Sequence, residues 1–343
     1  MGDRDEPVPL GAMIRAEIAE RGPMRLDRYI ALCNAHYYAT RDPFGRAGDF
    51  VTAPEITQAF GELLGAWCVS VWEGMGRPDP VLLAEAGPGR GTLMADALRL
   101  ADRVAPGFAA AARVHLIETS PVLRAAQQTR LGGRVAAWHD DIATLPEGPL
   151  LLVANEFLDA LPVRQILHDG RERAVGCEGE RLVWTTLPAP GEPPGERGEA
   201  ACAWVAALAA RIARESGAAL IIDYGHEGGA TDTLQAVRGH APADPLAAPG
   251  ETDLTAHVDF AAVAAASRAA GAAVHGPVPQ GTFLRALGLP ERTAVLCRAA
   301  RPGTARQLQA AARRLMDADA MGLVFKALAI AAPGLPAPPG FVP

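Results

Sequence analysis

Short, continuously apolar runs alternate with longer segments of helical spacing from Pro80 onward, and this alternation constrains the fold more than any other feature of the chain. The runs are residues 81–86, 113–118, 134–139, 150–155, 218–223 and 293–298. Such runs are typical of strands in a parallel sheet that helices cover on both faces. The helices expected between them are residues 92–104, 121–131, 200–215 and 260–270. The sequence therefore predicts a doubly wound α/β fold with a mostly parallel sheet.

The N-terminal residues and two insertions, the second at 226–259, are expected to build a second subdomain over the carboxyl edge of that sheet. Before the first strand, apolar residues at helical spacing predict helices over 13–21, 25–37 and 56–72. Between the fourth and fifth strands, residues 163–186 predict two or three antiparallel strands, because Asp169-Gly170 and Glu178-Gly179 are good turn signals. The Gly- and Pro-rich residues 187–199 predict a mobile linker.

The expected domain organisation follows from these regions. Residues 1–80 form an N-terminal helical cap, and residues 81–330 form the α/β domain. That domain carries insertions at about 163–200 and 226–259, the second of which lacks sheet periodicity. The last residues, 331–343, are rich in Pro and are expected to form a flexible tail.

Charge and cysteine content exclude several classes of protein. The 343 residues carry a formal net charge of −7, which argues against a general binder of nucleic acid or of anionic membranes. The five cysteines are scattered and form no CxxC pair, so we expect reduced thiols and no metal site. No apolar run reaches the ~18 residues of a membrane span, and the first residues lack a signal or transit pattern. We therefore expect a cytoplasmic protein without membrane insertion.

A glycine-rich segment, EAGPGRGT, follows the first strand and opens a helix. Glycine allows the backbone to turn sharply and to approach a ligand closely. A carboxylate two residues before the first glycine is unfavourable beside a pyrophosphate but stabilising beside a cation. The pattern therefore favours S-adenosyl-L-methionine (SAM), which carries a sulfonium and an ammonium group, over NAD; the alternative is a tight turn without a ligand. The candidate cofactor-binding residues are Glu85, Gly87, Pro88, Gly89, Gly91 and Thr92.

Acidic residues also end the second and third predicted strands. Glu118 is placed to accept hydrogen bonds from both hydroxyls of a ribose, and the alternative is a surface glutamate. Asp140 and Asp141 follow the third strand, where either could reach the adenine amino group. The sequence does not distinguish between these two, and a simple helix cap is the alternative.

The fourth and fifth strands run into polar clusters at the same edge. Asn155, Glu156 and Asp159 follow the fourth strand, and substrates bind near this point in open α/β sheets. The alternative is helix capping by Asn155 with dipole compensation by the two acids. Asp223 and His226 follow the fifth strand, although a lone histidine is more often structural.

Six blocks of sequence carry a resemblance to a known family: GDFVTAPEI from Gly48, EAGPGRGTL from Glu85, NEFLDALPV from Asn155, IIDYGH from Ile221, PGETDLTAHVDF from Pro249 and PVPQGTFL from Pro277. Together they resemble the MidA-like class of SAM-dependent methyltransferases. Mitochondrial members of that class assist respiratory complex I assembly by dimethylating an arginine of one subunit. The commoner family wording has Phe where Leu158 stands, Ser where Ala53 stands and often Leu where Ala86 stands, which are conservative changes.

The resemblance implies further site residues. Asp49, Thr52, Pro54 and Glu55 would belong to a loop that closes over the cofactor, with Asn155 also on the cofactor side. The residues implied to line the substrate side are Asp253, Thr255, His257 and Asp259. Without the resemblance, we would interpret the segment DLTAHVDF, residues 253–260, as a helix-capping stretch.

The resemblance also implies a mechanism and a partner. Methyl transfer from a sulfonium is an in-line displacement, so the protein mainly has to align the reacting groups. For an arginine of a protein substrate, such as a respiratory complex subunit, Glu156 is expected to be the main guanidinium acceptor. Asp159 or Asp223 would assist, and His226 would receive the released proton. The rival functions are methylation of a small molecule or another side chain, and an assembly chaperone that binds SAM and docks a partner.

Overall fold

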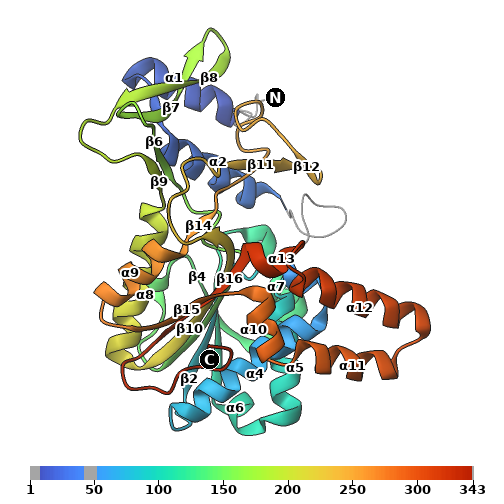
Figure 1. Ribbon diagram of the computed structural model, residues 1–343. Coiled ribbons are helices and arrows are strands. Elements are labelled where there is room, and N and C mark those ends of the chain that lie inside the picture. The colour runs from blue at the N-terminus through green and yellow to red at the C-terminus, as the bar shows by residue number, and fades with distance from the viewer. Residues whose placement is uncertain (1–7, 42–51, 342–343) are drawn as a thin grey trace, which may run out of the picture.

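The computed structural model describes residues 8–41 and 52–341. Within them, the central sheet has eight strands in the order β15-β16-β10-β5-β2-β3-β4, with the short β14 (Val258–Asp259) beside β10 (Figure 1). The parallel part consists of β2 (Val81–Ala86), β3 (Ala112–Ile117), β4 (Val135–His139), β5 (Leu150–Asn155) and β10 (Gly217–His226). The predicted doubly wound, mostly parallel α/β fold is therefore confirmed.

The strand order reverses between β2 and β5. From β2 the chain moves outward to β3 and β4, and it then returns to the other side of β2 as β5. Ala86 pairs with Ile117 on one side and with Ala154 on the other, so the three strands end level with one another. The loops after these strands therefore meet at one edge, which is where ligands bind in open α/β sheets.

The prediction of a strand at 293–298 is wrong, because these residues belong to helix α11 (Leu289–Ala299). Leu289 and Thr293, one helical turn apart, are its buried residues, and Val295 is exposed. The run is apolar in composition, but its burial follows the helical period.

Two antiparallel strands complete the sheet in its place. β16 (Phe325–Ala331) pairs with β10, and β15 (Ala273–Pro279) pairs with the other side of β16. β15 escapes prediction because Gly276 and Pro277 interrupt it. Both are tolerated there because β15 is an edge strand whose register shifts between His275 and Val278.

Helices cover both faces of the sheet, and each face has its own hydrophobic core. One core contains α4 (Gln58–Gly74) and α5 (Thr92–Val104), and the other contains α8 (Glu199–Glu215) and α9 (Phe260–Ala269). The strands contribute alternate residues to the two cores, as the continuous apolar runs predict. The further helices are α3 (Ala53–Ile56), α6 (Pro106–Ala111), α7 (Pro121–Leu131), α10 (Gln280–Ala286), α12 (Pro302–Met316) and α13 (Met321–Val324).

A second layer lies over the carboxyl edge of the sheet (Figure 1). Helix α4, expected from the sequence to belong to the N-terminal cap, packs against the sheet instead. The N-terminal helices α1 (Leu10–Arg21) and α2 (Leu26–Thr40) pack there against strands inserted between β5 and β10. These strands are β6 (Arg164–Ile166), β7 (Arg171–Glu178), β8 (Arg181–Pro188) and β9 (Gly195–Arg197). The short β1 (Met24–Arg25) pairs with β7, so the N-terminal helices and the insertion form one layer.

The second insertion has more regular structure than its sequence indicates. It contains a small antiparallel sheet of β11 (Gln235–Arg238), β12 (Ala241–Pro242) and β13 (Asp253–Thr255). Asn34 of α2 donates to the backbone carbonyl of Leu254 at 2.7 Å and to that of Ala160 at 2.8 Å. One side chain of α2 thus connects the second insertion to the loop after β5.

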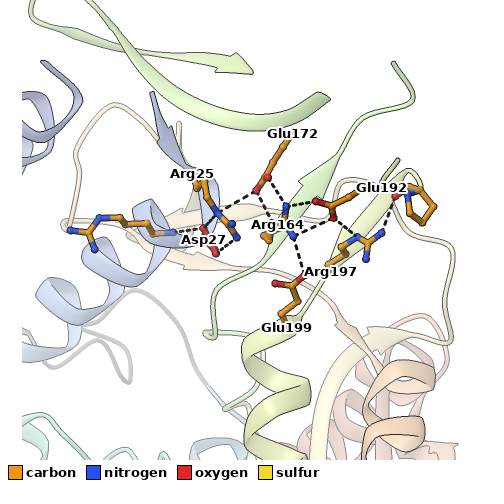
Figure 2. A network of polar contacts seen from close by, with 9 residues as sticks. Arg25, Asp27, Arg164, Glu172, Glu192, Arg197 and Glu199 are labelled. Carbon is orange, nitrogen blue, oxygen red and sulfur yellow. Dashed lines mark hydrogen bonds and ion pairs between the residues drawn. The ribbon is translucent and has the colours of Figure 1, made fainter. Parts of the chain in front are cut away.

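The prediction of a mobile linker at 187–199 is wrong, because a buried arginine holds this segment in place. Arg164 is 10% exposed and pairs with Glu172 at 2.7 Å, with Glu192 at 2.8 Å and with Glu199 at 3.0 Å. Figure 2 shows the three carboxylates around its guanidinium, which they bind through charge-assisted hydrogen bonds. Composition indicates a loop here, whereas the ion pairs depend on residues far away in the sequence.

The segment after β16 also packs against the body of the protein. Trp67 donates its indole N–H to the carbonyl of Pro339 at 3.2 Å, and the ring of Phe341 lies 5.2 Å from that of Phe283. The expectation of a flexible tail therefore does not describe residues 332–341. Within residues 8–41 and 52–341, no helix combines the length and the hydropathy that a membrane span requires.

Candidate active site

A cavity of about 740 Å³ lies between the carboxyl edge of the sheet and the second layer. Its walls come from the loops after β2, β3, β4 and β5, from α2, and from the β11–β13 sheet. Among the described residues that line it, six are acidic and none is Lys or Arg. The acids are Glu118, Asp140, Asp141, Glu156, Asp159 and Asp253. The cavity therefore suits a positively charged ligand or substrate.

The glycine segment forms the predicted tight turn at one end of this cavity. Gly87, Gly89 and Gly91 have φ values of 63°, 51° and 76°, which favour glycine. A Cβ on Gly87 would lie only 3.0 Å from the ring of Phe157. The turn leads into α5 at Thr92, so the predicted strand, glycine loop and helix are all present.

Beside this turn lies a small void of about 30 Å³ with buried oxygen atoms. Glu85 is 3% exposed, and its Oε2 has no hydrogen-bond partner among the residues that the structure describes. The same holds for Oδ1 of Asn155, which also lines the void. Burial raises the pKa of Glu85 to about 8. Two buried acceptors with no partner in the described part of the chain match a ligand that presents N–H donors or a positive charge.

The segment before α4 contributes to this end as well. Thr52, Pro54 and Glu55 line the small void, and Thr92 donates its hydroxyl to Glu55. The backbone N–H of Ala53 donates to Oε1 of Glu156 at 3.1 Å. Asp49, the remaining candidate from this loop, lies outside the described residues.

Glu118 is buried at the tip of β3. Its Oε1 accepts from the backbone N–H of Ser120 at 2.8 Å, and its Oε2 accepts from Gln127 at 3.3 Å. Gln127 also donates to the carbonyl of Gly89 at 2.7 Å and accepts from Trp138. Gln127 therefore connects the glycine loop to Glu118. The sequence contains one local signal for it, a polar residue on the buried face of α7.

Asp140 and Asp141 both line the cavity after β4. Asp140 pairs with Arg124 at 2.6 Å. Asp141 accepts from the backbone N–H of Ala143 at 2.8 Å and so caps a short 3₁₀ turn. The capping alternative thus applies to Asp141, and each carboxylate still borders the cavity.

Glu156 stands where the glycine end meets the rest of the cavity, since it lines both the cavity and the small void. Its φ of 51° is rare for a residue with a side chain and indicates local strain. Oε1 accepts from Ala53 and, at 3.1 Å, from Asn155, whereas Oε2 has no hydrogen bond within the described part of the chain. Burial raises the pKa of Glu156 to about 7.

Asp159 lies deeper in the same wall and is held by a tyrosine that the sequence did not single out. Tyr224 donates its hydroxyl to Oδ2 of Asp159, while Oδ1 is buried and finds no partner among the described residues. Burial raises the pKa of Asp159 to about 6. The ring of Tyr224 makes edge-to-face contacts with the rings of His257 and Phe325, with ring centroids 5.3 Å apart in each pair, and these contacts fix its orientation.

Asp223 and His226 do not line the cavity. Asp223 is fully buried beneath the loop after β5, where its Oδ2 accepts from the backbone N–H groups of residues 157, 158 and 159 at 2.9–3.2 Å. It therefore holds the loop that presents Glu156 and Asp159, and it is not placed to grip a substrate. His226 accepts from the backbone of Gly228, and the histidine that borders the cavity is His257.

The remaining wall comes from α2 and β13. Tyr38 donates its hydroxyl to Asp253 at 2.9 Å, and both line the cavity with Thr255. Asp259 instead caps α9 by accepting from Ala261 and Ala262, so its capping interpretation is correct. Tyr38 is more than 200 residues from its partner, and only the fold brings the two together.

Comparisons with known proteins assign this architecture to a family. A family model described as "Putative S-adenosyl-L-methionine-dependent methyltransferase" matches residues 63–278, which is more than half of the chain. The chain belongs to this family. Its cofactor is SAM, as the sequence predicts.

Individual relatives agree with the family match. This methyltransferase is 37% identical over 371 residues to "Protein arginine methyltransferase NDUFAF7 homolog, mitochondrial" of Drosophila melanogaster, covering 94% of this chain and 84% of the relative. It is 35% identical over 373 residues to "Protein arginine methyltransferase NDUFAF7, mitochondrial" of Mus musculus, covering 96% and 85%. Both names include a mitochondrial location. The expectation of a cytoplasmic protein is therefore contradicted.

A solved structure has the same overall fold. It is described as a "likely methyl transferase from Burkholderia thailandensis bound to S-adenosyl-homocysteine". The two chains are 28% identical and superpose with a TM-score of 0.82, covering 96% of this chain and 93% of the other.

The residues of this methyltransferase fit SAM. When bound, this cofactor supplies a methyl group on a positively charged sulfonium. The glycine turn leaves room for close approach, and beside it lie the oxygens of Glu85 and Asn155 that have no hydrogen bond within residues 8–41 and 52–341. The cavity of about 740 Å³ extends from this turn to α2 and the β11–β13 sheet, beyond the residues that would hold the cofactor.

Proposed function

We propose that this methyltransferase methylates an arginine side chain of a protein partner. The observation that carries the proposal is the acidic cavity beyond the glycine loop, where Glu156, Asp159 and Asp253 line the walls and no Lys or Arg does so among the described residues. A guanidinium would neutralise these carboxylates and form paired hydrogen bonds with them. The names of the relatives, which are protein arginine methyltransferases, support the same target.

We assign to the residues of the cofactor half the roles expected from the sequence. Glu85 and Asn155 hold the cationic amino-acid end, because each has a buried oxygen that no described residue contacts by a hydrogen bond. Glu118 accepts from the ribose hydroxyls, since it is buried at the tip of β3 and lines the cavity. Asp140 and Asp141 stay the candidates for the adenine amino group.

Glu156 and Asp159 act on the substrate half. Each has one oxygen engaged by the protein and one oxygen left for a ligand. A guanidinium held between them would lose a proton when its nitrogen takes the methyl group and the bond from that methyl to the sulfonium sulfur breaks. Glu156, with a pKa of about 7, is better suited than a typical glutamate to receive that proton. Asp223 and Tyr224 are positioning residues, which hold the loop and Asp159 respectively.

The partner is a protein whose arginine is exposed enough to enter the cavity, and a subunit of a respiratory complex is the candidate suggested by the MidA-like resemblance. The experiment compares arginine methylation by mass spectrometry in cells with the gene, without it, and with Glu156→Gln. We expect one or more arginine sites to lose methylation in the last two. The purified protein should then form S-adenosyl-homocysteine only when that partner is present.

Two outcomes would refute the proposal. If product forms with a small molecule and no arginine site changes, the enzyme acts on another substrate class. If cells that carry only Glu156→Gln assemble the partner's complex normally while its arginine stays unmethylated, the protein works by docking, as a chaperone would.

A further inference from the structure

The hairpin of α11 and α12 has a charge opposite to that of the whole protein. Residues 289–316 contain six arginines and one acidic residue, Glu291, in a chain with a formal net charge of −7. Figure 1 shows the two helices side by side, extending away from the central sheet. Such a separation of charge favours association with a partner of opposite charge.

One of the six arginines anchors the hairpin, and five do not. Arg292 pairs with the buried Glu62 of α4 at 2.7 Å. The other five are exposed and form no ion pair within residues 8–41 and 52–341. They are Arg298, Arg301, Arg306, Arg313 and Arg314, which we call the basic hairpin.

The arginines of α12 occupy the side that faces solvent. Arg306 and Arg313 are seven residues apart, which is about two helical turns, so they lie on one face. The opposite face packs inward through Ala312 and Leu315. Like charges gathered on one face repel each other, and an anionic partner would relieve that repulsion.

The basic hairpin ends close to the acidic cavity. Arg314, in the last turn of α12, acts electrostatically on Glu156 and lowers its pKa against the larger effect of burial. The next helix, α13, carries Leu323 and Val324, which are exposed, and Val324 also lines the cavity. A protein whose side chain enters the cavity therefore passes near the end of α12.

We propose that the basic hairpin binds an acidic segment of the same protein that presents its arginine to the cavity. This inference rests on the proposed function and adds a second recognition element to it. The substrate would carry an arginine for the acidic cavity and, at a distance in its structure, carboxylates for the hairpin. An extended polyanion such as a membrane or a nucleic acid fits less well, because it would also face the acidic remainder of the protein.

Binding can be measured by fluorescence anisotropy with a labelled peptide of about ten alternating glutamate and serine residues. The test variant is Arg306→Glu with Arg313→Glu. The matched control is Arg103→Glu with Arg268→Glu, which reverses two exposed arginines on α5 and α9. We expect the hairpin variant to bind the peptide at least about fivefold more weakly than wild type, and the control to stay within about twofold. SAM affinity and circular dichroism should be the same in all three proteins.

Equal peptide binding by the hairpin variant and wild type would overturn the inference. The inference would also be overturned if phosphatidylglycerol vesicles or a single-stranded DNA oligonucleotide bound wild type more tightly than the peptide does. This result counts only if the hairpin variant weakens that binding, which shows that the same arginines are used. With the unmethylated partner protein as substrate, the hairpin variant should have a higher KM than wild type and the same kcat. If wild type methylates no protein arginine, the proposed function fails separately, because the peptide experiment needs no turnover.

Discussion

Glu85 should make the ligand-free protein less stable as the pH rises, because its carboxyl is buried in a site shaped for a cation. The pKa of this group is raised by burial from 4.5 to about 8. The folded state therefore binds the proton more tightly than the unfolded state does. Its favourable contribution to stability is fully present below about pH 4.5 and is lost as the pH rises through about 8.

The size of the effect follows from this pKa. At about 1.36 kcal/mol for each pKa unit, the cost of ionising Glu85 grows from below ~1 kcal/mol at pH 4.5 to about 4 kcal/mol at pH 8. This figure is an upper bound, because a protein relaxes and water penetrates around a buried charge. Glu85→Gln keeps the shape of the side chain and removes the ionisation, so it should stabilise the ligand-free protein at pH 8.

The assay is chemical denaturation of wild type, Glu85→Gln and the control Glu147→Gln, which changes an exposed glutamate, at pH 4.5 and pH 8. We expect Glu85→Gln to be more stable than wild type at pH 8 by about 1–4 kcal/mol and similar to it at pH 4.5. Calorimetry should show SAM affinity reduced about tenfold or more, because a charged acceptor is lost. The reasoning is refuted if the stability difference between Glu85→Gln and wild type does not change with pH.

Three further predictions concern the same cavity. Glu156→Gln should leave SAM affinity within about threefold of wild type and lower turnover on the protein substrate by about two orders of magnitude or more; a parallel loss of both would place Glu156 in cofactor binding alone. Glu118→Ala should weaken SAM binding roughly tenfold to a hundredfold in calorimetry, since a charge-assisted acceptor is worth about 1.5–3 kcal/mol, and unchanged affinity would move the ribose contact elsewhere. Tyr224→Phe removes a hydrogen bond that lowers the pKa of Asp159, so the acidic limb of the pH–rate profile should move to higher pH. A uniform loss of rate without that movement would make Tyr224 merely structural.

Local patterns correctly predicted the strand, the glycine turn and the helix at the end of β2. A strand, a glycine turn and a helix follow one another directly in sequence, and Gly87, Gly89 and Gly91 all adopt the positive φ that the pattern requires. Glu118 could be placed because a strand end is itself a local feature. For the same reason, helices α5 and α7 have the predicted bounds.

The substrate half could be predicted less well, because it is assembled from distant segments. Tyr38 reaches the cavity only because α2 folds over the sheet, and its partner Asp253 lies on β13. Asp223 and Tyr224 are neighbours on β10, yet the first points beneath the loop and the second faces the cavity. The alternation of side chains along the strand determines which of the two faces the cavity, and the polar composition of the segment does not show this.

The position of β16 has a consequence for synthesis of the chain on the ribosome. β16 follows every other strand of the central sheet in sequence, but it lies inside the sheet, paired with β10 on one side and β15 on the other. Until residues 325–331 emerge, β10 lacks this neighbour and presents an unpaired edge, which can attract another chain. The acidic cavity is also incomplete at that stage, since Phe325 lines it. A premature stop codon before Phe325 should therefore produce an aggregating chain rather than a weakened enzyme.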